Sequence, residues 1–240
     1  MGQEHRFRPY VAIQGVGVAL RRKRRHMNIT IIGASDAFAR GLAIWASAAG
    51  HDVTMVGFNL GQAETLAKTI SRSKAAGPSD PLLDKLIFMA MPYSCVLDAL
   101  DFYGKQLDGK IVVDVTTPIH LDTFEPIHPE AGSVAQQIAT ARPRARVVKA
   151  FNPRFAGPLR PEENLSEETR DVFLAGDDVE AKHVVAQLFR KGGLHPIDVG
   201  PLRRARELEA AGYLNAARRA PTLTNRQAAA HTIQKESSKC

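Results

Sequence analysis

The stretch 28-NITIIGASDAFARGLA-43 decides the fold. Its β-branched run, 29-ITII-32, predicts a buried strand, and Gly33 predicts the tight turn that follows it. The next residues place apolar side chains at helical spacing, and 50-GHDVTMVG-57 predicts a second strand. This strand, helix and strand have the length and order of a mononucleotide-binding unit, in which the helix N-terminus holds a pyrophosphate.

The chain after Met27 continues to alternate short apolar runs with longer amphipathic ones, which is typical of a parallel sheet covered by helices. We therefore expect an α/β protein with a doubly wound parallel sheet, that is, a Rossmann-like NAD(P)-binding fold with C-terminal helices. Segments 28–33 and 110–115 are expected to be neighbouring strands of that sheet. The segment 71–81 is rich in Gly, Pro and Ser, and we expect a loop there. The expected strands are 28–33, 52–57, 86–91, 110–115, 145–151, 171–176 and 195–199, and the expected helices are 37–49, 61–72, 93–104, 133–141, 179–191 and 202–219.

Length and charge define the domain organisation. A chain of 240 residues with 44% apolar content can bury one sizeable core. Residues 1–26 hold seven of the 32 Lys and Arg residues and one acid, so the rest of the chain is nearly neutral. We expect 1–26 to be a basic, disordered and dispensable extension, 27–220 to be a Rossmann-type reductase domain, and 221–240 to be a polar tail.

The basic extension also raises the question of partners and location. Contact with an anionic surface or with nucleic acid is the alternative reading of 1–26, but we do not expect a nucleic-acid partner. Its apolar run is too short to span a bilayer, so we expect no membrane span. Cys95 and Cys240 lack the spacing of a metal or redox motif, which favours a reducing cytoplasm.

The phosphate loop departs from the usual glycine-rich pattern. Gly33 is the only glycine of the pattern that this loop retains, and Asp36 stands where the second glycine is normally found. A carboxylate beside a diphosphate would repel it by about 1 kcal/mol or more, although Asp36 could instead cap the following helix. The candidate contacts of this loop with a cofactor are Gly33, Ala34, Ser35, Asp36, Phe38 and Ala39.

At the level of motifs, the chain resembles the NADP oxidoreductases that depend on the deazaflavin coenzyme F-420, together with the related NADPH-dependent ferric-reductase domains. The resemblance implies direct hydride transfer between NADP(H) and a deazaflavin ring stacked on it, which needs positioning of the two rings but no protein acid, base or nucleophile. We therefore expect no catalytic residue in the strict sense. The matching segments follow the family's order from Met27 to about residue 220: 29-ITIIGAS-35, 50-GHDV-53, 89-MAMPYSCV-96, 109-GKIVVDVTTP-118, 147-VVKAFN-152, 171-DVFLAGDDVEAK-182 and 198-DVGPLRRARELE-209.

The resemblance also shows what this chain lacks. The Ser and Arg that hold the 2′-phosphate of NADP in the family fall on Gly57 and Phe58, and an assisting lysine falls on Gln62. No hydroxyl, guanidinium or ammonium is left for that phosphate, so we expect weak nucleotide binding without a preference for NADP over NAD. Phe58 could stack on adenine, and Asn59 is the nearest polar group for the ribose hydroxyls.

The nicotinamide end retains more of the family's pattern. By the same resemblance, Met91, Pro92 and Tyr93 would line the ribose and ring pocket, and Thr116 and Thr117 lie at the next strand end. Ala150 and Asn152 stand at the carboxyl end of the strand 145–151, where open parallel sheets bind ligands, and we expect Asn152 to make a polar contact near the transferred hydride. The alternatives are structural, because Pro92 could simply end its strand and Asn152 could form a turn before Pro153. We expect Lys149 to be paired rather than catalytic.

The remaining candidates concern metals and self-association. His120 and His128 lie eight residues apart in a loop without a third ligand at a suitable spacing, so we expect no metal site. The C-terminal helix carries a helical stripe, Leu202, Ala205, Leu208, Ala211 and Leu214. We expect it to pack on its own sheet, while the resemblance adds a homodimer contact and a reach of Arg203 towards the cofactor.

Two functions follow. The first is an oxidoreductase that transfers a hydride between a nicotinamide dinucleotide, NADP or NAD, and coenzyme F-420 or a similar acceptor. The alternative is a non-catalytic Rossmann-fold binding or regulatory protein whose nucleotide site has decayed.

Overall fold

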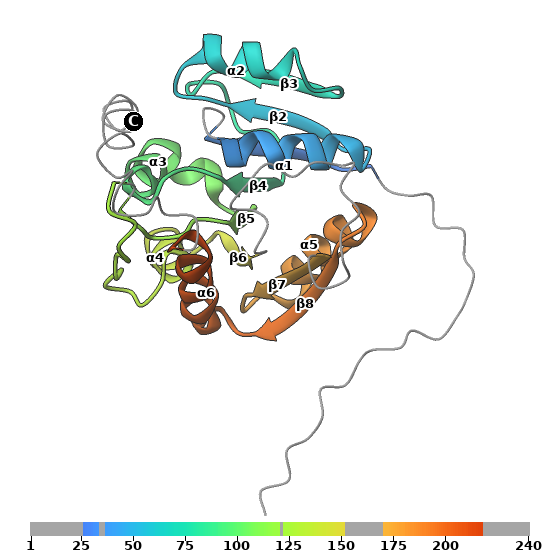
Figure 1. The fold of residues 1–240 in the computed structure, drawn as a ribbon. Coiled ribbons are helices and arrows are strands. Elements are labelled where there is room, and N and C mark those ends of the chain that lie inside the picture. Colours follow the sequence, from blue (N-terminus) through green and yellow to red (C-terminus); the bar gives the residue numbers. More distant parts are fainter. Residues whose placement is uncertain (1–25, 34–36, 121, 152–169, 218–240) are drawn as a thin grey trace, which may run out of the picture.

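The protein, seen here as a computed structural model, is built on one eight-stranded sheet covered by helices on both faces (Figure 1). The structure describes residues 26–33, 37–120, 122–151 and 170–217. The strand order is β3-β2-β1-β4-β5-β6-β7-β8. The strands are β1 (Asn28–Ile32), β2 (Asp52–Val56), β3 (Ser73–Ala76), β4 (Leu86–Met89), β5 (Ile111–Asp114), β6 (Arg146–Phe151), β7 (Asp171–Ala175) and β8 (His195–Gly200).

The helices cover the two faces as separate layers. The α-helices are α1 (Ala37–Ala48), α2 (Leu60–Ala67), α3 (Val96–Tyr103), α4 (Val134–Ala141), α5 (Val179–Lys191) and α6 (Ala205–Ala217), and the short 3-10 helices are η1 (Tyr93–Cys95), η2 (Gly104–Leu107) and η4 (Leu202–Arg204). One core cluster joins α1, α2 and α5 to the sheet, and the second joins α3, α4 and η4 to the opposite face. In the described part of the chain, none of the helices has the length and apolarity needed to cross a bilayer.

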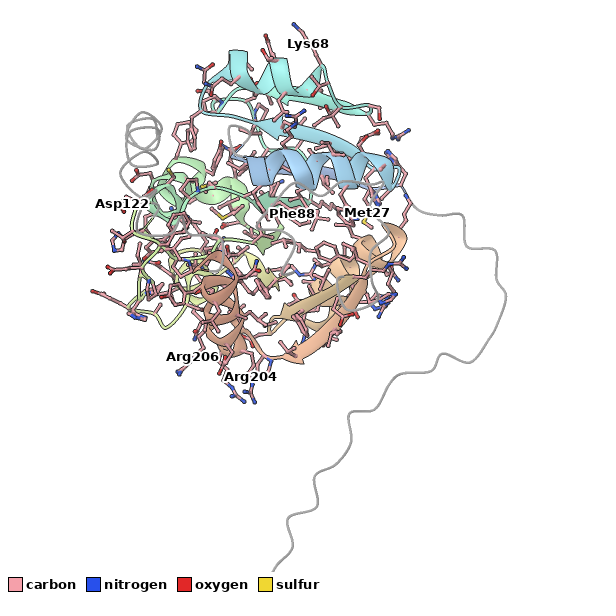
Figure 2. All side chains as sticks on the ribbon, viewed as in Figure 1. Met27, Lys68, Phe88, Asp122, Arg204 and Arg206 are labelled. Atoms are coloured by element: carbon pink, nitrogen blue, oxygen red, sulfur yellow. The ribbon has the colours of Figure 1, made fainter. Side chains whose placement is uncertain are left out.

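The central strands are mostly apolar because both of their faces are buried. In β4, Leu86 and Phe88 belong to the first cluster, while Ile87 and Met89 belong to the second. Figure 2 shows Phe88 in the interior, where its ring meets Phe189 of α5 edge to face at a centroid distance of 6.3 Å. This contact packs α5 against the first face of the sheet.

Strands β1 to β6 are parallel, as the sequence predicts, so their carboxyl ends meet at one edge of the sheet. The expected doubly wound sheet and all seven expected strands are confirmed. The parallel order ends at β6, because β6 and β7 pair antiparallel, with Phe151 opposite Phe173. The end of β7 therefore lies at the other edge of the sheet, away from the ends of β1 to β6.

Two expectations were wrong, and a third was correct only in part. Segments 28–33 and 110–115 belong to one sheet but are not neighbours, because β4 lies between β1 and β5. The expected loop 71–81 contains an edge strand, β3, whose residues SKAA pair with β2. The helical stripe of the C-terminal helix is only half correct, because Leu202, Ala205 and Leu208 are buried but Ala211 and Leu214 are exposed.

Candidate nucleotide-binding edge

The ends of the parallel strands define the candidate site, which we call the carboxyl edge: Gly33, residues 57–59, 90–93 and 115–117, and Phe151. Open parallel sheets bind ligands outside these ends, at the point where the chain order along the sheet reverses. Here the chain runs outward from β1 through β2 to β3 and outward on the other side from β4. The reversal therefore lies between β1 and β4.

Gly33 occupies this reversal point and has a structural reason to be glycine. Its φ is +110°, and a Cβ built on it would stand 2.1 Å from the carbonyl oxygen of Ala90. Its N–H donates to the oxygen of Val56 at 3.0 Å, so it joins the ends of β1 and β2. Gly33 can thus offer only its backbone surface to a ligand.

The end of β2 carries no cationic group. Gly57 is buried directly after the strand, and Phe58 is 37% exposed. Asn59 caps α2, because its Oδ1 accepts the N–H of Gln62 at 3.2 Å. The oxygen expected to bind a ribose is therefore already engaged in a helix cap, which leaves the amide N–H₂ group of Asn59 for any ligand.

The end of β4 is shaped by its turn into η1. Met91 is buried in the second core cluster, and Pro92 lies at the N-cap of η1, three residues after β4 has ended at Met89. The Tyr93 hydroxyl donates to Oε1 of Gln137 on α4 at 3.2 Å. Met91 and Tyr93 thus hold the start of η1 and α3 in place beside the edge.

The end of β5 is held by buried charges. Thr116 donates its N–H to Oδ1 of Asp114 at 2.8 Å, and its carbonyl accepts from Nζ of Lys149 at 2.5 Å. The Thr116 side chain is 5% exposed, and its Oγ1 has no hydrogen-bond partner among the described residues. Thr117 is half-buried and lies against Gly212 of α6.

Lys149 of β6 is paired, as expected, and its partners form a buried cluster. Its Nζ lies 2.8 Å from Oδ2 of Asp114 and 3.0 Å from Oε1 of Glu209 on α6. Burial alone would lower the pKa of Lys149, but the carboxylates of Asp114 and Glu209 raise it overall. Burial also raises the pKa of Glu209, and Lys149 offsets only part of that effect.

Asp114 and Glu209 were not among the residues expected at this edge. A signal for Asp114 was present, because Asp114 is the single charge in 111-IVVD-114, and Lys149 is the charge that interrupts the apolar residues after Arg146 in 146-RVVKAF-151. Charges in strands that are buried on both faces must pair. Nothing in the helical pattern of α6 pointed to Glu209 as the third member.

Several expected contacts lie elsewhere. Ala39 and Ala150 are buried in the first core cluster, and Phe38 packs against it, so their side chains contribute to packing. Ala34, Ser35, Asp36 and Asn152 lie outside the described residues.

The loop between β5 and α4 contains two short-range contacts. Ile119 bridges to Pro126, and the N–H of His120 donates to the oxygen of Glu125 at 2.9 Å. His120 and His128 are both exposed. Within the ranges that the structure describes, no group of three or more His, Cys, Asp or Glu side chains is arranged to hold a metal ion.

The strand order and the carboxyl edge define a Rossmann-like nucleotide-binding fold. No family model matches the chain. The chain is 34% identical over 189 residues to the metalloreductase STEAP3 of Rattus norvegicus, a match that covers 76% of this chain and 36% of that protein. It is 29% identical over 130 residues to the F420-dependent NADP reductase of Methanocaldococcus jannaschii, which covers 52% of this chain and 57% of that protein.

A solved structure supports the same fold. A provisionally named F420-dependent NADP reductase from Arthrobacter sp. FB24 superposes with a TM-score of 0.67 at 24% identity, covering 80% of this chain and 92% of that one. The chain is a homologue of F420-dependent NADP reductase, as its motifs predict, and is related to the STEAP metalloreductases as well. It spans 36% and 57% of the length of the two curated relatives described above.

Proposed function

We propose that this chain binds a nicotinamide dinucleotide along the carboxyl edge and is an oxidoreductase that transfers a hydride between that nucleotide and a deazaflavin or a similar acceptor. The observation that carries the proposal is the reversal of chain order between β1 and β4, with Gly33 and Ala90 in close contact at that point. This is where doubly wound sheets bind nucleotides. The names of the two relatives, a metalloreductase and an NADP reductase, point to the same class of reaction.

The two halves of the nucleotide would lie on opposite sides of the reversal. The adenosine half would lie over the end of β2, where the partly exposed Phe58 offers a ring for stacking. The nicotinamide half would lie over the ends of β4 and β5, near Met91, Thr116 and Thr117. Thr116, whose buried hydroxyl has no hydrogen-bond partner among the described residues, and the half-buried Thr117 supply the hydroxyl groups at this end of the edge.

The same edge supports a lack of preference for NADP. The residues that follow β2 and β3 at this edge, 57–62 and 77–80, contain no Lys or Arg. The turn after β3 instead carries the carboxylate of Asp80, whose Oδ2 accepts the N–H of Gly77 at 2.7 Å. A 2′-phosphate near these residues would lack a charge partner, so NADP would gain nothing over NAD.

Positioning would supply the chemistry. A hydride passes directly between carbon atoms of two stacked rings, so the protein must orient the rings and exclude water rather than move protons.

We also propose that residues 27–220 form the reductase domain, that the protein works in the cytoplasm, and that it self-associates through α6, where Leu214 is 64% exposed.

A single-turnover experiment tests the proposed reaction. The protein is mixed with NADH or NADPH carrying deuterium at the transferred position, together with oxidised deazaflavin, and deuterium in the reduced deazaflavin is measured by mass spectrometry. A parallel arm offers a soluble ferric complex, because the relative with 34% identity is a metalloreductase. Transfer of the label supports the proposal. Nucleotide binding without turnover in either arm would instead support the non-catalytic alternative.

A further inference from the structure

Glu209 of α6 is buried at the junction of three elements. Its side chain is 5% exposed, and its Oε1 lies 3.0 Å from Nζ of Lys149 on β6. The N–H of Val134, the first residue of α4, lies 3.0 Å from Oε1 and 3.1 Å from Oε2 of the same carboxylate. One side chain therefore ties α6 to the sheet and to the N-terminus of α4, beside which α6 packs (Figure 1).

The charge cluster leads from Glu209 to the backbone of Thr116. An ammonium group has three protons, and among the described residues the acceptors around Lys149 are Asp114, Glu209 and the carbonyl of Thr116. Asp114 in turn accepts the N–H of Thr116 at 2.8 Å. Both backbone groups of Thr116 are thus held by members of the cluster, so a change at Glu209 reaches Thr116 through Lys149.

The same face of α6 also contacts the next residue. Gly212 lies three residues after Glu209, which places both on one face of the helix. A Cβ built on Gly212 would stand 2.8 Å from Oγ1 of Thr117 and 3.4 Å from the ring of Phe151. The helix backbone therefore lies directly against Thr117, and a side chain larger than hydrogen at position 212 would displace it.

We propose that Glu209 is a positioning residue for the nicotinamide half of the bound dinucleotide, and that it acts through Lys149 on the turn formed by Thr116 and Thr117. The identity of the ligand rests on the proposed function. The selectivity for the nicotinamide half follows from position, because this turn lies after β5, on the opposite side of the chain reversal from Phe58. A disturbance at the turn reaches the ring end and leaves the adenosine end of the edge unchanged.

The binding test compares NADH with ADP-ribose, which lacks the nicotinamide ring, on the full-length protein. Glu209→Gln should weaken NADH binding by about tenfold and ADP-ribose binding by less than about twofold. Glu207→Gln is the matched control on the exposed side of α6, where Glu207 lies 3.9 Å from Arg204 and Arg206, and it should change neither. Should Glu209→Gln not fold, Gly212→Ala keeps every charge and should show the same selective loss.

A measurement without ligand separates this proposal from the proposed function. Hydrogen exchange at the Thr116 amide should be faster in Glu209→Gln than in the native protein and unchanged in Glu207→Gln. Equal weakening of both ligands, or unchanged exchange at Thr116, would overturn the positioning role of Glu209. If the native protein binds neither ligand, the proposed function fails, and the role of Glu209 in nucleotide binding falls with it, whatever the exchange shows.

Discussion

Gly33 at the end of β1 lies against Ala90 after β4, so closely that a Cβ on Gly33 would stand 2.1 Å from the Ala90 carbonyl oxygen. The contact joins the two strands between which the chain order reverses. It explains why this glycine is present although the rest of the glycine-rich pattern is missing. The first glycine is required by the fold itself, whereas the second glycine of that pattern allows the backbone to approach the phosphate.

Gly33→Ala should destabilise the protein by about 3 kcal/mol or more, because it combines strain at positive φ with a clash against backbone atoms. Gly109→Ala is the matched control, since Gly109 also has a positive φ, +72°, but has nothing within 4 Å of its built Cβ. It should cost about 1 kcal/mol. Urea unfolding followed by the fluorescence of Trp45, the single tryptophan, measures both. Equal losses in the two variants would show that the contact with Ala90 is unimportant.

A preference for NADPH should be created by two substitutions at the end of β2. The double variant Gly57→Ser and Phe58→Arg should strengthen NADPH binding by about 1.5–3 kcal/mol through charged hydrogen bonds, with little change for NADH. The control variant is Leu83→Arg, which adds the same charge at a distant position. Leu83 is 78% exposed and lies just before β4, at the end of that strand opposite the carboxyl edge. It should affect neither nucleotide. A rise in the affinity for both nucleotides in the double variant would argue against a specific phosphate contact.

Lys149→Met should cost about 3–5 kcal/mol at neutral pH, because it leaves the buried carboxylates of Asp114 and Glu209 without a cation. Lys68→Met, at an exposed position on the outer side of α2 (Figure 2), should stay within about 0.5 kcal/mol. The free energy of unfolding is measured in urea. A small loss for Lys149→Met would show that the cluster is hydrated in solution.

The pH dependence of the Lys149→Met loss follows from the pKa of Glu209, which burial already raises above its usual value of 4.5. A carboxyl group whose folded pKa is raised binds its proton more tightly in the folded state, so stability falls as pH rises from 4.5 through the raised pKa. Without Lys149 the pKa of Glu209 should rise further. The loss in Lys149→Met should therefore be smaller at pH 5 than at pH 7, and a loss that grew on acidification would contradict this account.

His51 should make the protein sensitive to acid. It is fully buried, its Nδ1 accepts the N–H of Met27 at 3.2 Å, and burial followed by the charge of Lys191 lowers its pKa to about 4. Because the unfolded chain has the higher pKa of 6.5, stability should be lost as pH falls from about 6.5 through about 4, by up to about 3 kcal/mol.

The variant His51→Gln keeps an acceptor for Met27 but cannot take up a proton in this range. It should lose less stability than the native protein between pH 6.5 and pH 4. His128→Gln, at an exposed histidine, should behave as the native protein does. Thermal melting across this pH range gives the comparison, and an unchanged acid response in His51→Gln would assign the sensitivity to other groups.

The sequence predicted the strands well because buried parallel strands are apolar on both faces. It missed β3, whose four residues SKAA lie at the sheet edge, are small or charged, and bury little surface. Strand order was not predictable by the same reasoning. Local patterns report which segments are buried but not which of them pair, so 110–115 was placed beside 28–33 where β4 actually lies.

The candidate site was predictable where backbone geometry decides it, and less so where distant side chains meet. The positions of Gly33, Gly57, Met91 and Thr116 at one edge follow from the strand ends alone. The cap formed by Asn59 and the cluster around Lys149 depend on contacts between elements, and Glu209 reaches that cluster across 60 residues of sequence.

The most direct test of the account is a calorimetric titration of the native protein with NADH and with NADPH under identical conditions. The account predicts that both nucleotides bind, with dissociation constants within about threefold of each other, because no Lys or Arg among residues 57–62 and 77–80 can pair with the 2′-phosphate of NADPH. Absence of binding by either nucleotide, or binding of NADPH that is far tighter than that of NADH, would contradict it.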